Sequence, residues 1–512
     1  RFIPFYYLTT FVRQPIMKLT STFVGLAAAD LPVHCLRHEV SGSWKFHLSE
    51  ASSERSACGH LRPDDSRKQP KINLDQLSSK MDVHLTSPKV ATSETQKGWW
   101  SMIYDEGFEV HLGDTKFFAF SGFDESVEAD GRIENYRSRC HETQVGWYHD
   151  TAQDKWGCWV GTKTDPSSMI QTSIKRMEIT SGAAVERAVS QAGAQARVSL
   201  EEHRAHVEKI NSAQSSWTAT VYSNLLNLTR AELNEKSGIR RSGRSAPRQE
   251  RASFLQTAVS EKVRQRLKSL PTDFDWRNKD GQDFVGDAVD QGGCGSCYVH
   301  AAVRMMSSRK RIQQGDPRGE GFSMQFPLFC SEYNQGCAGG FPELIAKWGQ
   351  DVGLVPESCG KYDLTEQKCK LSCDLHQVEK WRVADYGYVS GVYGAPAGEV
   401  EMMEEVHERG PIAVAMEPTD DFMYYSNGIF SHAAVLFNEW ARVDHAVLVT
   451  GWGEENGKKY WRVQNSWGPG WGEQGTFRIA RGNDESAIEA QAVWATLEPA
   501  KQPGNIASYL QA

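Results

Sequence analysis

Hydrophobic and polar residues alternate in short runs over the first part of the chain, between residues 30 and 162. Residues 42–48 and 108–112 alternate with a period of two and are rich in aromatic side chains, and no long helical stripe interrupts them. A period of two indicates strands with one buried face. Because this part also holds the four cysteines Cys35, Cys58, Cys140 and Cys158, the pattern predicts an antiparallel β domain cross-linked by disulfides.

A different pattern follows between residues 163 and 269. Proline and cysteine are absent from residue 167 to residue 246, and Val185, Val189, Val207 and Ile210 stand at helical spacings among Glu, Arg, Ala and Gln. This pattern predicts helices with one apolar side. An arginine-rich stretch at residues 240–251 indicates an exposed linker that proteases can cut. Asn227 begins a sequon for N-glycosylation.

From residue 270 onward, helical and strand patterns mix and cysteine, glycine and tryptophan become denser. These features predict a second compact domain. Residues 297–314 contain neither proline nor glycine, and Val299, Val303 and Met306 lie at positions i, i+4 and i+7. This spacing predicts a helix with one buried face, for which Ser296 is a candidate N-cap.

Charge and apolar content argue against two classes of protein. The 512 residues carry 57 Lys and Arg against 65 Asp and Glu, which gives a net charge of −8. An acidic balance argues against a nucleic-acid-binding face. No apolar run approaches the ~18 residues needed to cross a bilayer. We therefore expect no nucleic-acid partner and no membrane insertion.

The first residues of the chain indicate secretion. Met17-Lys18 is followed by a short apolar stretch at residues 23–26 and then by Ala27-Ala28-Ala29. A basic residue, an apolar core and small residues are the parts of a signal peptide. We expect residues 1–29 to form a signal peptide or leader, and the mature protein to begin at Asp30 in an oxidising compartment.

Eleven cysteines, an odd number, indicate disulfide pairs and one remaining thiol. Cys294 and Cys297 form a C-x-x-C with three interpretations. A redox dithiol requires a thioredoxin-like βαβ unit, which does not surround it. A zinc site requires further ligands, with Cys330 and Cys337 as candidates, but an oxidising compartment favours disulfides. The third interpretation, one structural and one catalytic cysteine, accounts for more of the neighbouring residues, so we expect no metal.

The catalytic interpretation starts from the position of Cys297. This residue opens the predicted helix, where the helix dipole stabilises a thiolate, the nucleophile that attacks an amide carbonyl. Gln291 lies six residues upstream. Its side-chain amide can donate to a developing oxyanion beside the backbone N–H of Cys297.

A candidate base lies far downstream. His445 falls on an alternating strand that runs toward the turn Asn456-Gly457, and Asn465 falls on the strand that returns. A hairpin with a bulge would place Asn465 beside His445. The amide can then hold the imidazole in one tautomer, while Trp467 shields their hydrogen bond from water.

These motifs resemble the papain family of cysteine peptidases. The residues that carry the resemblance are Cys-Gly-Ser-Cys-Tyr at 294–298, the distant His445, Asn-Ser-Trp-Gly-Pro-Gly-Trp-Gly at 465–472, Asp-Trp-Arg at 275–277 and Cys-Ala-Gly-Gly at 337–340. Upstream residues narrow it to the cathepsin C (dipeptidyl peptidase I) branch. They include Asp-Leu-Pro at 30–32, Gly-Phe-Glu at 107–109, Trp-Gly-Cys at 156–158 and Ser-Trp-Thr-Ala at 216–219.

The resemblance implies an α+β fold. It implies a papain-like peptidase domain of two subdomains, a helical half and a β-barrel half, at residues 270–497. An exclusion domain, an antiparallel β-barrel, would occupy residues 30–162, and a helical pro-segment residues 163–269. Residues 498–512 would form a C-terminal tail.

The resemblance also implies an activity, the removal of dipeptides from free N-termini through an acyl-enzyme. Cys297, His445 and Asn465 would be catalytic, with Gln291 and the Cys297 backbone as oxyanion donors. Substrate would be bound by Gly339, Gly340, Phe341 and Trp471, and by Asp30, whose carboxylate would pair with the α-amino group. The barrel would block the cleft beyond two residues.

The disulfides implied by the resemblance use ten of the eleven cysteines. They are Cys35–Cys140, Cys58–Cys158, Cys294–Cys337, Cys330–Cys369 and Cys359–Cys373, which leave Cys297 as the remaining thiol.

One position departs from the family pattern. The family has a tyrosine in the S2 pocket two residues after Gly-Gly-Phe, where it helps to hold a chloride ion, whereas this chain has Glu343. Tyr388 could supply the other aromatic ligand. A carboxylate beside a halide is unfavourable unless it is protonated or turned away. We therefore doubt a chloride requirement, and we expect S2 to favour polar or basic side chains.

The resemblance implies peptide and protein substrates with free N-termini, a homotetramer, and a lysosome-like compartment or secretion. Two other interpretations stay open. The chain could be a papain-type endopeptidase whose N-terminal domain has another role, or a catalytically silent scaffold whose barrel binds partners.

Overall fold

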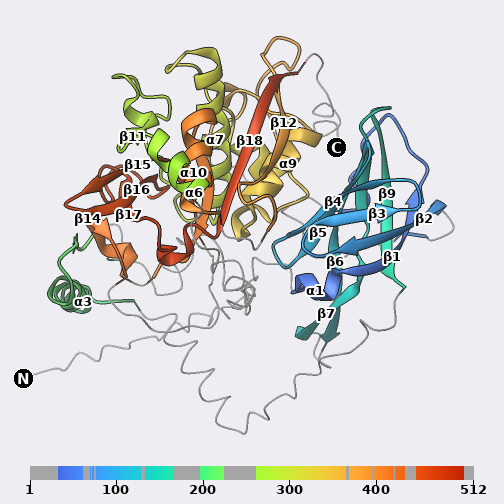
Figure 1. The fold of residues 1–512 in the computed structure, drawn as a ribbon, viewed down its shortest axis with the longest axis horizontal. Helices are drawn as coiled ribbons and strands as arrows, with labels where there is room; N and C mark the ends of the chain where they lie inside the picture. Colours follow the sequence, from blue (N-terminus) through green and yellow to red (C-terminus); the bar gives the residue numbers. More distant parts are fainter. Residues whose placement is uncertain are drawn as a thin grey trace, which may run out of the picture.

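The computed structural model describes residues 33–60, 70, 72–73, 77–127, 133–164, 197–223, 226, 261–364, 368–393, 397–419, 421–432 and 445–500. A β-barrel lies on the right of Figure 1 and a larger mixed α/β body on the left. The predicted α+β class is confirmed. The predicted signal peptide, Asn227, the arginine-rich linker and residues 501–512 lie outside the described residues.

The barrel is built from the first nine strands, all paired antiparallel. They are β1 (Gly42–Ser49), β2 (Leu77–Thr86), β3 (Val90–Ser93), β4 (Lys97–Ile103), β5 (Gly107–Leu112), β6 (Thr115–Val127), β7 (Ile133–Thr143), β8 (Gly146–Asp150) and β9 (Lys155–Lys163), with α1 (Arg37–Val40) before them. Pairing of β9 with β1 closes the ring. The alternation in β1 buries Trp44, Phe46 and Leu48 inside, as its period of two predicts.

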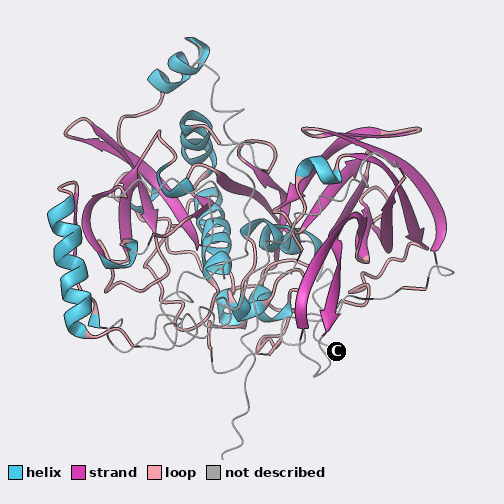
Figure 2. Cartoon of the chain, turned by 90° about the horizontal axis from the view of Figure 1, so that it is seen from below, coloured by secondary structure: helices cyan, strands magenta, loops and turns pink. Residues whose placement is uncertain are grey.

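The α/β body contains most of the helices. They are α6 (Glu261–Ser269), α7 (Cys297–Gln314), α8 (Gln325–Cys330), α9 (Pro342–Asp351) and α10 (Glu399–Arg409), with short 3-10 segments η5 (Trp276–Asn278), η6 (Gly336–Ala338), η7 (Glu357–Cys359), η8 (Phe422–Tyr424) and η9 (Glu485–Ala487). Figure 2 shows some helices in the middle of the molecule, between the strands on the left and the barrel on the right, and others at its edges.

The second sheet has the strand order β10-β14-β17-β16-β15-β13-β18-β12, and β11 pairs with β15. Its strands are β10 (Trp217–Ala219), β11 (Phe274–Asp275), β12 (Trp381–Tyr388), β13 (Ile412–Met416), β14 (Tyr425–Phe430), β15 (His445–Glu455), β16 (Lys458–Gln464), β17 (Thr476–Ala480) and β18 (Gln491–Pro499). Three neighbouring strands inside this sheet, β15, β13 and β18, pack against α7. The helix that begins at Cys297 and the strand that begins at His445 are thereby in contact.

Helix α7 spans the residues that the sequence predicted, and Val299, Val303 and Met306 are buried. It differs from the prediction in two ways. It is buried on nearly all sides, because β13, β15, β18 and α9 surround it. Ser296 stands at the N-cap position but makes no capping hydrogen bond with its side chain; its hydroxyl instead lies 2.7 Å from the hydroxyl of Tyr362.

The segment before the α/β body contributes one helix and one strand to it. Helix α3 (Leu200–Ala213) begins with a capping box between Ser199 and Glu202, and β10 pairs antiparallel with β14. Val207 and Ile210 pack on the core of the α/β body, as their helical spacing predicts, whereas Val185 and Val189 lie outside the described residues.

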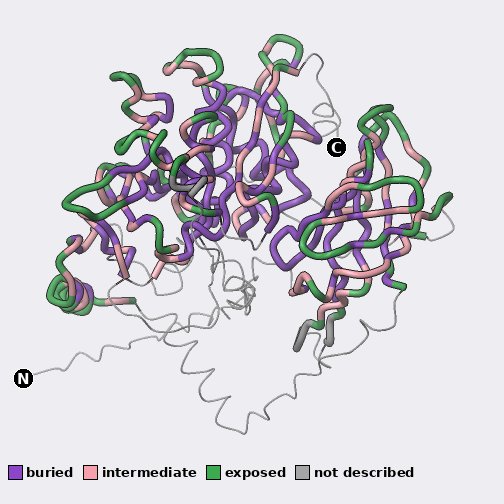
Figure 3. The backbone as a smooth tube through the Cα atoms, in the orientation of Figure 1, coloured by how far each residue is buried: buried purple, intermediate pink, exposed green. Residues whose placement is uncertain are grey.

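Barrel and α/β body share one hydrophobic core. Phe118 and Trp147 of the barrel cluster with Tyr333, Phe341 and Trp348 of the α/β body. Figure 3 shows the β4–β5 turn, on the barrel side that faces the α/β body, as buried. Among the described residues, no helix is both long and apolar enough to cross a membrane.

Candidate active site

Cys297 is the first residue of α7 and is fully buried. Two contacts fix the loop before it: the Cys294–Cys337 disulfide and a hydrogen bond from Gly295 N to Cys337 O of 2.9 Å. The backbone N–H of Ala446 donates to the Cys297 sulfur over 3.4 Å. The helix N-terminus and this N–H both stabilise negative charge on sulfur, so the site favours a thiolate.

His445 and Asn465 meet across the predicted hairpin. Strands β15 and β16 pair antiparallel, with a bulge between Val449 and Gly451. Asn456 and Gly457 take φ of 51° and 76° at the turn, the left-handed conformation that this dipeptide favours. The Nε2 atom of His445 lies 2.8 Å from Oδ1 of Asn465.

The contacts of Asn465 identify the histidine tautomer. Oδ1 of Asn465 also accepts a hydrogen bond of 2.8 Å from the backbone N–H of Ser466, which fixes the orientation of the amide. Because an amide oxygen only accepts, Nε2 of His445 must carry a proton. Nδ1 is then the nitrogen that can take a proton from a thiol and later give one to a leaving amine.

Trp467 covers this hydrogen bond, as the sequence predicted. Its ring stacks on His445 with a centroid separation of 4.9 Å. Trp471, expected among the substrate-binding residues, is 2% exposed and packs edge-on against Trp467 at 5.0 Å. Its visible role is therefore to support Trp467.

The candidate oxyanion donor, Gln291, is held by two side chains that the sequence did not indicate. Its Nε2 donates to Cys294 O over 2.9 Å, which leaves the second amide hydrogen for an oxyanion. Its Oε1 accepts from the Ser466 hydroxyl at 2.6 Å, and its backbone oxygen accepts from the Tyr362 hydroxyl at 2.8 Å. Ser466 follows Asn465 directly, which is the one sequence signal that could have identified it.

The predicted substrate strip, Gly339 to Phe341, follows η6. Tyr298, next to the nucleophile, donates to Gly336 O at 2.9 Å. Asn334 Oδ1 accepts from the Phe341 N–H at 2.8 Å. A Cβ on Gly340 would lie 2.3 Å from Asn334 Oδ1, so only glycine fits there. Sequence reasoning missed Asn334.

The barrel contacts the end of this strip. Tyr104, in the β4–β5 turn, has a φ of 54° and packs its ring 4.2 Å from that of Phe341. Asp105, the next residue, accepts from Cys35 N at 2.7 Å, and its carboxylate lies 2.8 Å from His34 Nδ1. The chain around residues 34 and 35 is therefore fixed beside the strip. Asp30 lies outside the described residues.

The structure contains five disulfides, and they join the same pairs that the family resemblance implies. These are Cys35–Cys140, Cys58–Cys158, Cys294–Cys337, Cys330–Cys369 and Cys359–Cys373. Cys297 is the one cysteine outside them.

The residues around Glu343 fit a halide poorly. Glu343 is 1% exposed, and among the described residues neither of its carboxyl oxygens has a hydrogen-bond partner. A second buried acid, Glu109, accepts a hydrogen bond from the Tyr386 hydroxyl at 2.8 Å. Tyr388, the candidate chloride ligand, is buried two residues further along β12. Despite burial, the pKa of Glu109 is held below its usual value, chiefly by the hydrogen bond and charge of His111, so it carries a negative charge, which is an unfavourable neighbour for another anion.

Comparisons with known proteins agree with this geometry. The papain family cysteine protease model matches residues 270–496, and the cathepsin C exclusion domain model matches residues 30–163. "Cathepsin C" of Schistosoma mansoni is 30% identical over 91% of this chain and 94% of its own length. "Dipeptidyl aminopeptidase 1" of Plasmodium falciparum is 23% identical over 94% of this chain and 95% of its own length.

A third relative matches only the second part of the chain. "Cathepsin L-like proteinase" of Fasciola hepatica is 34% identical over 42% of this chain and 61% of its own length. Together with the arrangement of Cys297, His445 and Asn465, these matches identify the α/β body as a peptidase domain and the barrel as an exclusion domain. The chain belongs to the cathepsin C branch of the papain family of cysteine proteases.

Proposed function

We propose that this cysteine peptidase removes dipeptides from free N-termini. The observation that carries the proposal is the position of the exclusion domain. Its β4–β5 turn packs Tyr104 on Phe341, at the end of the substrate strip. A papain-type cleft closed at this end admits few residues before the scissile bond. The names of two relatives, cathepsin C and dipeptidyl aminopeptidase 1, support the same assignment.

In the proposed reaction, the Cys297 thiolate attacks the carbonyl carbon of the second substrate residue. Gln291 and the Cys297 backbone N–H donate to the resulting oxyanion. Protonated His445 gives a proton to the leaving amine as the C–N bond breaks, which leaves a thioester. A water molecule then attacks the thioester, losing a proton to His445, and the dipeptide leaves as the thiolate re-forms.

Asp30 is the proposed anchor for the substrate's α-amino group. His34 is held beside the β4–β5 turn by Asp105, and four residues reach at most ~13 Å. The carboxylate of Asp30 can therefore approach the closed end of the cleft. A charge-assisted hydrogen bond to an ammonium contributes about 1.5–3 kcal/mol, so the anchor would select free N-termini.

The test compares one dipeptide fluorogenic substrate with its N-acetylated twin, at mildly acidic pH under reducing conditions and after removal of the pro-segment. Turnover of the free-amine substrate alone is the expected result. Equal turnover of both would indicate an endopeptidase with an open cleft. A Cys297 thiol that reacts with neither substrate would indicate a silent scaffold.

Four smaller proposals follow from the same family membership. We propose that activity needs no chloride, because the negative charge of Glu109 lies in this region, and dialysis against a halide-free buffer tests this. We propose that Glu343 biases S2 toward polar or basic side chains, which a peptide panel on the parent and Glu343→Tyr tests. Five disulfides fit a secretory compartment, and we propose that the enzyme acts in a lysosome-like compartment or is secreted. We also propose that it assembles as a homotetramer.

A further inference from the structure

Glu343 lies in the interface between the exclusion domain and the peptidase domain. It is the second residue of α9 and is 1% exposed. Neither of its carboxyl oxygens has a hydrogen-bond partner among the described residues. An ionised carboxylate in such a place would lack both water and donors, which is costly.

A second buried acid faces it from the exclusion domain. Glu109, on β5, is 2% exposed and accepts hydrogen bonds from the Tyr386 hydroxyl at 2.8 Å and from His111 Nε2 at 3.4 Å. Glu109 therefore has the donors that Glu343 lacks. Phe118 lies directly across from Glu109 in the β5–β6 register.

The charge of Lys347 compensates Glu343 only in part, because it lowers the pKa of Glu343 less than burial and Glu109 raise it. Lys347 lies one turn further along α9, and its ammonium donates to Asp351 at 2.8 Å and stands 5.6 Å above the Phe118 ring. The other titratable groups around the pair are His111 on β5, Lys116 on β6, Asp351 on α9, and Asp385 and Tyr386 on β12.

These surroundings shift the pKa values of the two acids in opposite directions. Burial, and then the charge of Glu109, raise the pKa of Glu343 well above its usual range. Burial alone would raise the pKa of Glu109 too, but the hydrogen bond and charge of His111, the charge of Lys347 and the hydrogen bond of Tyr386 hold it below its usual value. At acidic pH the pair carries one negative charge, on Glu109.

We propose that Glu343 and Glu109 are positioning residues which keep the exclusion domain seated only while Glu343 is neutral, so that a rise in pH loosens the restriction to free N-termini. The inference rests on the proposed dipeptidyl activity. It assigns acid-dependent specificity to the domain interface, separately from the titration of the catalytic residues.

The direction of this pH dependence follows from the linkage between proton binding to Glu343 and docking of the exclusion domain. Docking of the exclusion domain raises the pKa of Glu343, so the docked state binds the proton more tightly than the undocked state. Docking is strongest below the undocked pKa of ~4.3 and weakens as pH rises toward the docked value. Each unit of difference weakens docking about tenfold over that window.

The experiment measures turnover of the free-amine substrate and its N-acetylated twin from pH 5 to pH 7.5, using the full mature enzyme. For the parent, we expect the ratio of the two rates to fall at least about tenfold across this range. For Glu343→Gln, whose amide stays neutral, we expect a ratio that does not change with pH. Glu408→Gln, an exposed acid on α10, is the control and should follow the parent.

A second variant and a second readout guard against misfolding of Glu343→Gln. Glu109→Gln keeps an acceptor for Tyr386 but removes the like charge, so its ratio should fall less than that of the parent. Amide-hydrogen exchange of β5 and α9, corrected for the intrinsic exchange rate at each pH, should rise with pH in the parent and not in Glu343→Gln. A parent ratio that is high at pH 5 and constant to pH 7.5 would overturn the inference alone, whereas no preference for free amines at pH 5 would overturn the proposed function.

Discussion

Ser466 shows how a residue outside the catalytic set controls its geometry. Its hydroxyl donates to Oε1 of Gln291 at 2.6 Å, and its backbone N–H donates to Oδ1 of Asn465 at 2.8 Å. The side chain therefore orients the oxyanion donor, and the backbone orients the partner of His445. Only the first of these contacts can be removed by substitution.

We predict that Ser466→Ala lowers kcat about tenfold and leaves KM unchanged, because an unrestrained Gln291 donates to the oxyanion only part of the time. Loss of a whole oxyanion donor costs about 10²–10³ in kcat, which we expect for Gln291→Ala. Steady-state kinetics on the free-amine substrate measure both. Ser308→Ala is the matched control, because that buried hydroxyl on α7 has no hydrogen-bond partner among the described residues. An unchanged kcat in Ser466→Ala would show that Gln291 needs no such support.

Local patterns were enough to single out the candidate catalytic residues that the structure brings together, but not the residues that support them. Cys297 was indicated by its helix start, and His445 and Asn465 by a hairpin whose turn residues are diagnostic. The hydroxyl of Tyr362, in contrast, reaches Gln291 from 71 positions away in sequence. Such a contact depends on how loops pack, which no local period of hydrophobic residues records.

At the scale of elements, the helix and the hairpin of the site were predictable because each depends on near neighbours in sequence. Strand β10 was not, because it has three residues and pairs with β14 far downstream. The position of β10 depends on Trp217, whose Nε1 donates to Ser431 O at 3.0 Å, and on α3, which packs beside it. Tertiary partners, rather than strand propensity, create this element.

The packing of α3 predicts that the contact of α3 and β10 with the peptidase domain depends on pH. His203 is fully buried, and its Nδ1 lies 2.8 Å from the Tyr424 hydroxyl. Burial lowers the pKa of His203. A lowered pKa means that His203 binds a proton less readily when α3 is packed on the peptidase domain than when it is released. This packing is therefore strongest above the free pKa of ~6.5 and weakens as pH falls below it.

We therefore expect amide-hydrogen exchange of β10 in the full chain, corrected for the intrinsic exchange rate at each pH, to increase as pH drops below ~6.5. His203→Asn places a neutral amide near the Nδ1 position and should make that exchange independent of pH. His376→Asn, at an exposed histidine, should behave as the parent. Equal acid sensitivity in His203→Asn and the parent would assign the effect to other groups.

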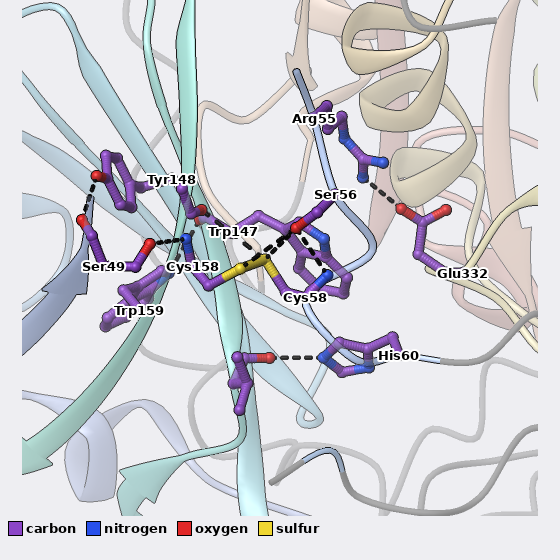
Figure 4. Close-up of a disulfide and its surroundings, with 12 residues drawn as sticks. Ser49, Arg55, Ser56, Cys58, His60, Trp147, Tyr148, Cys158, Trp159 and Glu332 are labelled. Carbon is purple, nitrogen blue, oxygen red and sulfur yellow. Dashed lines mark hydrogen bonds and ion pairs between the residues drawn. A yellow bond between two sulfur atoms is a disulfide. The ribbon is translucent and has the colours of Figure 1, made fainter. Parts of the chain in front are cut away.

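At the scale of the whole molecule, the family resemblance implied both domains and a barrel that closes the cleft, but not the side chains that join the two domains. Figure 4 shows Arg55, in the segment before the Cys58–Cys158 disulfide, directed at Glu332 of the peptidase domain. The two side chains lie 2.5 Å apart and are almost entirely buried. Arg55 also donates to the Tyr333 hydroxyl at 2.6 Å, across 278 positions of sequence. From sequence alone, Arg55 is one arginine in a polar loop.

This contact leads to a prediction about stability and specificity together. Arg55→Met removes the charge but keeps an apolar stem between Trp156 and Tyr333, whose rings lie 5.5 Å and 5.2 Å from the guanidinium. Glu332 is then buried without its cation, which costs about 3–5 kcal/mol. We expect a lower urea midpoint for unfolding of the barrel and increased turnover of the acetylated substrate.

The double variant Arg55→Met with Glu332→Gln separates the ion pair from the packing. Because it removes both charges, we expect it to recover most of the stability that Arg55→Met loses. If the acetylated substrate is again rejected, the closed end of the cleft depends on the seating of the barrel rather than on this ion pair. If stability returns but the acetylated substrate is still cut, Arg55 itself holds the barrel in the position that excludes longer substrates.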